Sequence, residues 1–333
     1  MMRLPPFQYL APVSVADAVK LMADHGPEAM LVAGGTDLYP NMKRRQFEPT
    51  VLVGLRGIRE LAGVRQPGAG ALAIGAGTTL TAVARHPEVR ARYAALATAA
   101  GAVSTPQLRN MGTLGGNVCV DTRCNYYNQS YQWRKAVNFC MKKDGEICLV
   151  APGSPRCWAV SSSDTAPALW SLGASVRLAG LAGERTIPIS ALYQDDGIQY
   201  LTKQPGEIVT EIVLPPAEGA RSVYLKLRRR GSFDFPVLGV AATLHMDGEI
   251  VRQARIVLGA VASLPRESGE AGRLMIGERL TPELIDRAAD AAYRPAKPLD
   301  NTDLTHPYRK KMVRVYVARA LRRLAGLPDE GET

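Results

Sequence analysis

The segment from Val118 to Ser163 constrains the fold more than any other part of this sequence. It shows neither a helical nor a strand period, and it is rich in polar and aromatic residues. All five cysteines of the chain lie there, four of them between Cys124 and Cys157. An unstructured stretch of this length is uncommon in a compact domain unless another constraint organises it. A metal site bound by the cysteines would supply that constraint.

The spacing of the cysteines narrows the kind of metal site. The pattern Cys124-x15-Cys140-x7-Cys148-x8-Cys157 contains no C-x2-4-C pair, which zinc ribbons and fingers favour. Four thiolates also suit an iron–sulfur cluster, and the wide spacing favours this reading over zinc. Spacing alone leaves open which four of the five cysteines bind. We expect Cys119 to be the spare, because it follows a glycine-rich motif directly and is expected to pack there.

Two motifs combine a Gly-Gly pair with a hydroxyl side chain. The first is Ala33-Gly34-Gly35-Thr36-Asp37-Leu38, after a short apolar run, and the second is Arg109-Asn110-Met111-Gly112-Thr113-Leu114-Gly115-Gly116-Asn117. Adjacent glycines let backbone N–H groups approach an anion without a Cβ in the way. Either motif alone is typical of a turn, but the pair suggests one cradle for each half of a pyrophosphate. The sequence therefore predicts a dinucleotide cofactor, without the G-x-G-x-x-G or P-loop fingerprints.

Local patterns indicate an α+β mixture of short strands and helices, without the regular βαβ alternation of a doubly wound sheet. Ser14 is expected to cap a helix that ends at Gly26-Pro27. The other expected helices are Thr81–Arg85, Val89–Ala100, one starting at Thr281-Pro282, and one over about Tyr308–Ala325 with His306-Pro307 as its start signal. The expected strands are Met30–Ala33, Val51–Val53, Leu72–Ile74, Ala174–Leu178, Arg185–Ile189 and a hairpin of Val237–His245 with Glu249–Gly259. The length of 333 residues suggests two domains, with a linker at Pro215–Gly219.

Composition and charge exclude several classes of protein. The net charge of +10 comes from short basic runs such as Lys43-Arg44-Arg45, without the motifs of nucleic-acid binding, so we expect no nucleic-acid partner. An anionic cofactor or an acidic partner subunit fits this charge. No apolar run approaches the ~20 residues of a membrane span, and the N-terminus lacks the apolar core of a secretory signal. We therefore expect a cytoplasmic protein with reduced thiols and no membrane partner. Scattered histidines and the absence of G-x-S-x-G and H-E-x-x-H leave hydrolase chemistry without support.

Together these motifs resemble the FAD-binding (medium) subunits of the xanthine oxidase/carbon monoxide dehydrogenase family of molybdenum hydroxylases. The resemblance covers essentially the whole chain, through AGGTDL, RNMGTLGGN, DTAPALWSLGA, GEIVTEIVLP and VYLKLRRRGSFDFPVLGVAATL. It implies an α+β fold with a two-lobed, molybdopterin-dehydrogenase-type FAD-binding domain over residues 1–216. A smaller α/β domain of the CO dehydrogenase flavoprotein C-terminal type would follow over residues 217–333.

The cysteine-containing segment narrows the resemblance. Other members of the family run from the second glycine motif almost directly into the segment that begins at Asp164. Here residues 118–160 intervene, and NVCVDTRCNYYNQSYQWR looks closest to the β subunits of 4-hydroxybenzoyl-CoA reductases, a branch of this family. Those subunits carry a [4Fe–4S] cluster on such a loop. The resemblance implies that Cys124, Cys140, Cys148 and Cys157 are its ligands.

The resemblance also implies which residues bind FAD. They belong to the two glycine motifs and to four further short matches: Val32, Ala33, Gly34, Gly35, Thr36, Asp37, Val103, Ser104, Thr113, Leu114, Gly115, Gly116, Asn117, Asp164, Val209 and Lys226. Val209 in a core and Lys226 on a strand surface would be the simpler interpretations of those two residues. No catalytic residue is assigned to this chain, because the family binds substrate on another subunit.

The implied function is an electron relay in aromatic degradation under anaerobic conditions. Reduced ferredoxin would be the donor, with [4Fe–4S] and FAD on this chain, [2Fe–2S] clusters on a small subunit and the molybdenum cofactor on a large one. The assembly would be a dimer of heterotrimers that reduces a 4-hydroxybenzoyl thioester to benzoyl-CoA, and this chain alone would be inactive. One alternative is the FAD subunit of a related hydroxylase that oxidises another aromatic or heterocyclic substrate. Another is a non-enzymatic binding module stabilised by zinc.

Overall fold

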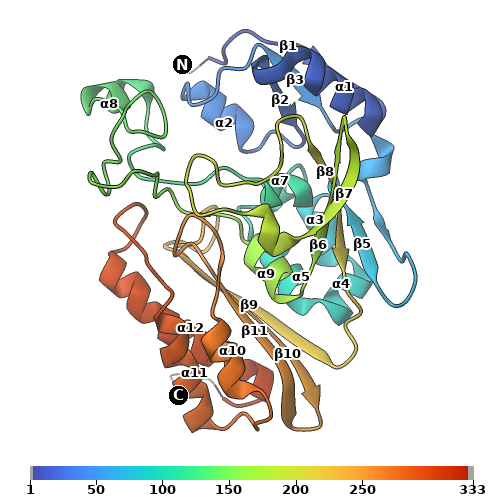
Figure 1. Ribbon diagram of the computed structural model, residues 1–333, viewed down its shortest axis with the longest axis vertical. Coiled ribbons are helices and arrows are strands. Elements are labelled where there is room, and N and C mark those ends of the chain that lie inside the picture. Colours follow the sequence, from blue (N-terminus) through green and yellow to red (C-terminus); the bar gives the residue numbers. More distant parts are fainter. Residues whose placement is uncertain (1–2, 329–333) are drawn as a thin grey trace.

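The computed structural model describes residues 3–328, which form a mixed helix and sheet fold with three separate sheets. A first lobe holds a three-stranded sheet, a second lobe holds a five-stranded sheet, and the C-terminal domain holds a four-stranded sheet. Figure 1 shows the two lobes in the upper part of the molecule and the C-terminal domain below them. The predicted boundary at residue 216 falls in the connection between strands β8 and β9.

The first lobe is a small parallel sheet in the order β1-β3-β2, formed by β1 (Gln8–Leu10), β3 (Val51–Gly54) and β2 (Ala29–Val32). Helix α1 (Val15–His25) joins β1 to β2, and α2 (Leu38–Lys43) follows β2. As predicted, Ser14 caps α1 by accepting a hydrogen bond from the amide of Asp17. This lobe does contain two parallel connections, β1-α1-β2 and β2-α2-β3, which the sequence patterns did not predict, within a sheet too small to be doubly wound.

The second lobe contains an antiparallel sheet in the order β4-β5-β8-β6-β7. Its strands are β4 (Val64–Arg65), β5 (Leu72–Gly75), β6 (Ser175–Gly180), β7 (Gly183–Pro188) and β8 (Ile208–Leu214). Its helices are α3 (Leu80–Arg85), α4 (Pro87–Arg92), α5 (Ala94–Ala102), α6 (Pro106–Arg109), α7 (Leu114–Val118) and α9 (Thr165–Ser171). The helix expected over Val89–Ala100 is wrong: it is two helices, broken at Tyr93. The buried Tyr93 donates its hydroxyl to the carbonyl of Pro215 (2.7 Å), a tertiary contact that local sequence does not reveal.

The C-terminal domain is an antiparallel sheet in the order β12-β11-β10-β9 with three helices. Its elements are β9 (Ala220–Leu227), β10 (Leu238–Asp247), β11 (Ile250–Gly259), β12 (Arg266–Glu267), α10 (Gly269–Met275), α11 (Pro282–Tyr293) and α12 (His306–Ala325). The predicted hairpin at Asp247-Gly248 is confirmed. Since all strands are antiparallel, this domain is α+β rather than the expected α/β. Helix α12 starts at His306, two residues before the predicted Tyr308, and its N-cap is Thr305 rather than His306.

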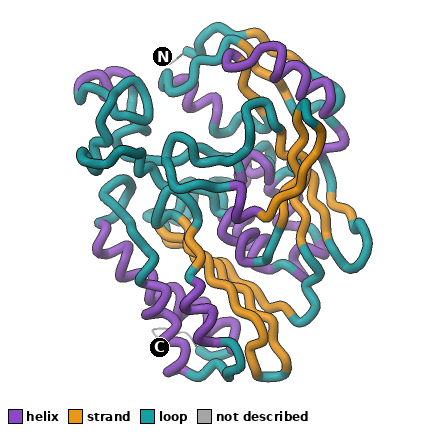
Figure 2. Tube along the Cα trace, in the orientation of Figure 1, coloured by secondary structure: helices purple, strands orange, loops and turns teal. Residues whose placement is uncertain are grey.

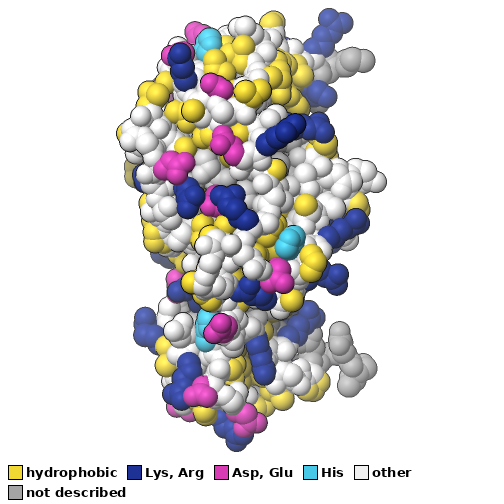
Figure 3. Space-filling view, turned by 90° about the vertical axis from the view of Figure 1, so that its right-hand side faces the viewer, with side chains coloured by type: hydrophobic (Ala, Val, Ile, Leu, Met, Phe, Trp, Pro, Cys, Tyr) yellow, Lys and Arg dark blue, Asp and Glu magenta, His cyan; other side chains and the backbone are white. Residues whose placement is uncertain are grey.

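Both faces of the β9–β11 sheet are covered. Leu238, Val240 and Leu244 pack against the helices of the C-terminal domain, whereas Tyr224 and Ala241 join the core of the second lobe. The alternation of inward and outward side chains along a strand thus ties the two domains together. On the face seen in Figure 3, Lys and Arg side chains are spread among acidic ones rather than gathered in one patch.

The segment between α7 and α9 has little regular structure, as predicted. Its one helix is the short α8 (Tyr131–Ala136), and Figures 1 and 2 show the rest as a long loop that extends to one side of the molecule. The loop leaves and returns through an antiparallel bridge, in which Arg123 and Val160 exchange backbone hydrogen bonds of 2.9 and 2.7 Å. Its far end is held by the fully buried Arg134, which donates to the carbonyls of Arg44 (3.0 Å) and Arg45 (3.1 Å).

Candidate functional site

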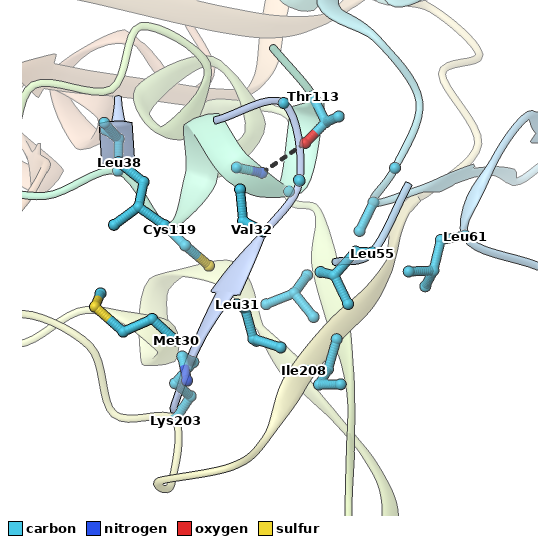
Figure 4. Close-up of a pocket in the computed structure, with 18 of the residues that line it drawn as sticks. Met30, Leu31, Val32, Leu38, Leu55, Leu61, Thr113, Cys119, Lys203 and Ile208 are labelled. Atoms are coloured by element: carbon cyan, nitrogen blue, oxygen red, sulfur yellow. Dashed lines mark hydrogen bonds between the residues drawn. The ribbon is translucent and has the colours of Figure 1, made fainter. Parts of the chain in front are cut away.

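A cavity of about 1240 Å³, partly open to solvent, lies between the two lobes and residues 119–121. Strand β2 and both glycine motifs form part of its wall, and residues 180–185 and 203–209 form another part. Figure 4 shows Met30 and Cys119 on one side of β2, and Leu55 and Leu61 on the other. A large cavity with an apolar lining and a few convergent polar loops is typical of a cofactor site.

The two glycine motifs meet at this cavity. A Cβ on Gly34 would collide with the backbone carbonyl of Met111 and press on the amide of Gly112, so glycine is required for the first loop to lie against the second. A Cβ on Gly115 would lie 2.6 Å from the Cβ of Ala76. Thr113 caps α7 by accepting a hydrogen bond from the amide of Gly116 (3.1 Å), the bond drawn in Figure 4. The chain therefore brings together two loops that are far apart in sequence.

Most of the residues predicted to bind a dinucleotide line this cavity. They are Val32, Ala33, Gly34, Gly35, Thr36, Asp37, Val103, Ser104, Thr113, Gly115, Gly116, Asn117 and Val209. Leu114, Asp164 and Lys226 do not line it. Leu114 is fully buried in the core of the second lobe, because a short helix turns its side chain away from the cavity.

Asp164 and Lys226 lie behind the cavity wall, where they pair with each other. The Lys226 Nζ donates to Asp164 Oδ2 (2.9 Å), and both side chains are buried. The hydroxyl of Tyr224 donates to the other oxygen of this carboxylate (2.7 Å). Lys226 also donates to the carbonyl of Ala102 (3.0 Å), next to the Val103-Ser104 turn that does reach the cavity. Burial raises the pKa of Asp164, and the Lys226 cation opposes that effect.

Four cysteines gather outside the cavity, in the long loop. Cys124, Cys140 and Cys157 pack with Tyr127 and Ala159 in one buried cluster. Cys148 is buried as well, and the charges of Cys140 and Cys148 both act on the pKa of Cys157. Burial raises the pKa of Cys124 to about 12 and that of Cys157 to about 11. Backbone amides oppose this shift: those of Tyr126 and Tyr127 donate to the Cys124 sulfur, and that of Ala159 to the Cys157 sulfur.

The spacing of these thiols differs from that of a single-ion site. Among residues 3–328, no three His, Cys, Asp or Glu side chains approach closely enough to hold one metal ion. Four sulfurs on one zinc ion lie within about 4 Å of each other, since each Zn–S bond is about 2.3 Å. Cys119 stands apart from the other four: it lines the cavity, and burial raises its pKa to about 11.

A buried lysine lies between the cysteine cluster and the cavity. The Lys142 Nζ donates to Asp121 Oδ1 (2.8 Å), to the Thr122 hydroxyl (2.8 Å) and to the Gly197 carbonyl (2.6 Å). Its positive charge also lowers the pKa of Cys157. Asp121 lines the cavity, so one ion pair contacts both environments. Sequence reasoning missed this lysine, because it has no motif and its partner is remote in sequence.

Arg123 is a second residue that sequence reasoning missed. It lies between Asp121 in the cavity wall and Cys124 in the cluster, and its side chain is buried. Its guanidinium is paired with the carboxylate of Asp37 in the first glycine motif. Burial lowers the pKa of Arg123 to about 10. The only sequence signal was its place directly before the first clustered cysteine.

Comparison with known proteins shows which family has these two domains. The family model described as the FAD binding domain in molybdopterin dehydrogenase matches residues 5–217, and the CO dehydrogenase flavoprotein C-terminal domain matches residues 222–324. This chain belongs to the FAD-binding medium subunits of the xanthine oxidase/CO dehydrogenase family. It is accordingly the FAD subunit of a molybdenum hydroxylase family enzyme, and an oxidoreductase subunit.

Several relatives of this medium subunit are similar over most of its length. The carbon monoxide dehydrogenase medium chain of Hydrogenophaga pseudoflava is 32% identical, covering 95% of this chain and 96% of the relative. The aldehyde oxidoreductase FAD-binding subunit PaoB of Escherichia coli is 35% identical, covering 74% and 78%. The reconstituted CO dehydrogenase from Oligotropha carboxidovorans has a chain that superposes with a TM-score of 0.81 at 30% identity, covering 98% of this medium subunit and 100% of that chain.

The comparisons confirm the predicted family, the FAD cofactor and the mixed two-domain fold. Within residues 3–328 of this medium subunit, no helix combines the length and apolar character that crossing a membrane requires.

Proposed function

We propose that this medium subunit relays electrons in an enzyme that resembles 4-hydroxybenzoyl-CoA reductase. The observation that supports this most is a set of four buried cysteines in the long loop. Three of them, Cys124, Cys140 and Cys157, pack in one cluster, and Cys148 is close enough to act on the pKa of Cys157. A thiol set of this kind beside an FAD cavity fits a subunit with two redox centres rather than one. The overall reaction would consume two electrons and two protons, remove the phenolic hydroxyl of the thioester as water, and release benzoyl-CoA.

FAD fits the cavity described above. The volume and the mainly apolar lining of the cavity suit the flavin ring system, and the two glycine motifs leave room for the anionic pyrophosphate. The residues that would hold FAD are the cavity-lining members of the predicted set, led by Gly34, Thr36, Thr113 and Gly116. When bound, FAD exchanges electrons both singly and in pairs, which suits a relay. The chain contributes position and burial.

The four cysteines of the long loop offer the donor set that a [4Fe–4S] cluster needs. Cys124, Cys140, Cys148 and Cys157 are all buried, and their charges act on the pKa values of Cys124 and Cys157. Four thiolates are the usual ligands of such a cluster. Amide donors to the sulfurs and the nearby Lys142 cation would stabilise bound thiolates and tune the reduction potential of such a cluster.

The partners follow from the same proposal. Two relatives are medium chains of carbon monoxide dehydrogenases, and a medium chain implies an assembly with further chains. We propose a large subunit with the molybdenum cofactor and a small subunit with [2Fe–2S] clusters, arranged as a dimer of heterotrimers in the cytoplasm. Ferredoxin is the proposed donor, and the net charge of +10 suits an acidic protein of that kind.

A second candidate is an FAD subunit of a hydroxylase that works in the oxidative direction on another aromatic or heterocyclic substrate. One relative favours it, because nicotinate, the substrate in the name of the nicotinate dehydrogenase FAD-subunit, is a heterocycle. The glycine motifs fit either candidate. The four buried cysteines favour the reductase, since a second redox centre on this subunit would give electrons a place of entry beside FAD.

The test is to purify this medium subunit without oxygen, alone and with its two partner subunits. We expect about four iron and four sulfide per medium subunit, flavin absorbance, and a broad brown shoulder. The complete enzyme with a strong reductant should convert 4-hydroxybenzoyl-CoA to benzoyl-CoA, and the isolated chain should not. A colourless zinc protein would refute the relay. Iron and FAD without this turnover, but with oxidation of a heterocycle, would select the second candidate.

A further inference from the structure

Three polar side chains close a triangle between the cavity and the cysteine loop. The guanidinium of Arg123 is paired with Asp37 Oδ1, and its Nη1 donates to Asn41 Oδ1 (3.3 Å). The Asn41 amide in turn donates to Asp37 Oδ2 (3.0 Å). Both oxygens of the Asp37 carboxylate are therefore occupied. Since Arg123 and Asn41 are buried, this arrangement fixes the position of Asp37 and of the glycine motif that contains it.

The guanidinium of Arg123 also contacts an aromatic ring in the cavity wall. Its guanidinium carbon lies 4.4 Å from the ring centroid of Phe235, and Phe235 lines the cavity together with Asp37. This cation–π contact links the C-terminal domain to the same arginine. One side chain thus joins the first glycine motif, helix α2 and Phe235.

The backbone of Arg123 is equally constrained. It exchanges two hydrogen bonds with Val160, and it is bonded covalently to Cys124 in the thiol cluster. Consecutive Cα atoms are about 3.8 Å apart, so the Cα atoms of Asp121 in the cavity wall and Cys124 are separated by at most about 11 Å. A change in the position of Cys124 is therefore transmitted to Arg123 without a flexible linker.

The charge of Arg123 matters for an anionic ligand. Asp37 is a carboxylate on the wall of a cavity whose proposed ligand carries a pyrophosphate. Unpaired, that carboxylate would repel the ligand, because like charges in a partly buried site interact strongly. Paired with Arg123, it is neutralised, and the loop remains close to its neighbour.

We propose that Arg123 is a positioning residue that makes FAD binding and assembly of the cysteine site cooperative. A cluster bound by Cys124 would hold Arg123 in place. Arg123 would in turn hold Asp37 of the first glycine motif in place and neutralise its charge. Coupling of this kind is reciprocal, so FAD would favour cluster assembly by the same factor. This inference rests on the proposed function.

The experiment is a double-mutant cycle in the full-length chain, with FAD removed and then titrated back while flavin fluorescence is followed. We expect Cys124→Ser, which should lose the cluster, to weaken FAD binding about tenfold, and Arg123→Gln to weaken it by a similar factor. The double variant should then be weakened about tenfold rather than a hundredfold, because both changes break one connection. Iron content is measured for every variant.

Matched variants separate coupling from general damage. Arg156 also precedes a clustered cysteine, but it pairs with Asp195 (3.0 Å) and stacks on Trp158 (3.6 Å), away from the cavity. Arg156→Gln should therefore change FAD affinity less than twofold. Asp37→Asn removes the other partner of the Arg123–Asp37 ion pair. In that background, Cys124→Ser should weaken FAD binding by less than twofold.

The possible outcomes distinguish a failure of the coupling from a failure of the proposed function. Additive effects, with a hundredfold loss in the double variant, or an unchanged affinity in Cys124→Ser, would overturn the coupling while leaving an iron and FAD protein intact. Absence of iron from the unmodified chain would instead overturn the proposed function, and the coupling with it. If Arg123→Gln fails to fold, Asp37→Asn combined with Cys124→Ser decides the same question.

Discussion

The guanidinium of Arg123 is paired with the carboxylate of Asp37, although one residue precedes a clustered cysteine and the other belongs to the first glycine motif. This contact joins two regions that have different chemistry. On one side lie buried thiols, and on the other lies a large cavity bordered by glycine loops. Their proximity makes it possible to test each region and then the connection between them.

The close approach of the two glycine loops should be essential for FAD binding. Gly34→Ala places a methyl group against the backbone of Met111, and neither backbone can move aside easily. Overpacking of this kind costs about 1–3 kcal/mol, which corresponds to about a 5- to 150-fold loss of FAD affinity if the cost falls on the FAD-bound form. Fluorescence titration of the FAD-free protein measures it. Gly153→Ala is the control, because a Cβ there meets nothing within 4 Å; equal affinity in both variants would contradict the role of the loop contact.

Cys124→Ser should remove iron from the protein, since a serine hydroxyl is a poor replacement for a buried thiolate ligand. FAD should still bind, although more weakly. Cys119→Ser is the matched control: Cys119 lines the cavity and lies outside the cluster, so iron content should stay at about four per chain. Iron and sulfide analysis measures both variants. Retention of about four irons in Cys124→Ser would contradict the ligand assignment.

Iron uptake should become more favourable as the pH rises. Burial holds the pKa of Cys124 at about 12 and that of Cys157 at about 11, so both thiols are protonated at pH 7 in the iron-free protein. Ligands must lose their protons to bind metal. Each thiol that ionises on binding contributes up to about tenfold in affinity per pH unit. Competition with a chelator between pH 7 and pH 9 measures this trend, and an affinity independent of pH would argue against thiolate ligands.

Lys226→Met should destabilise the protein, because it leaves the buried Asp164 carboxylate without its cation. Breaking one side of a buried pair costs about 3–5 kcal/mol. Burial already raises the pKa of Asp164, and loss of Lys226 raises it further, above the unfolded value of about 3.9. A carboxyl whose folded pKa is raised loses stability as the pH rises from its unfolded pKa through its folded pKa.

The stability loss of Lys226→Met relative to the unmodified chain should therefore be larger at pH 8 than at pH 5. Urea unfolding at both values measures it. Combining Lys226→Met with Asp164→Asn removes the titrating group and should abolish the pH dependence. A penalty equal at pH 5 and pH 8 in the single variant would show that Asp164 does not become an unpaired charge.

The local sequence was sufficient to predict structural features that depend on neighbouring residues. Ser14 caps α1, and Asp247-Gly248 turns the C-terminal hairpin, because each depends on residues a few positions away. The break at Tyr93 depends on the distant Pro215 carbonyl, so a helical pattern could not reveal it. The residue types of the two glycine motifs were sufficient to predict that they act together. The positions of Arg123 and Lys142 between the cavity and the thiols depend on tertiary contacts, so the sequence did not reveal them. Asp164 and Lys226, predicted to bind FAD, do not line the cavity. They pair with each other, and Lys226 donates to the carbonyl of Ala102 beside the Val103-Ser104 turn.

The bridge between Arg123 and Val160 has a consequence for how this chain is put together. Because the excursion over residues 124–159 departs and returns at one hydrogen-bonded pair, its two ends are already adjacent. A short turn between the same two residues would close the frame without displacing the strands and helices on either side. The thiol-bearing excursion is thus a self-contained insertion, whose removal would leave two residues that are already paired to each other.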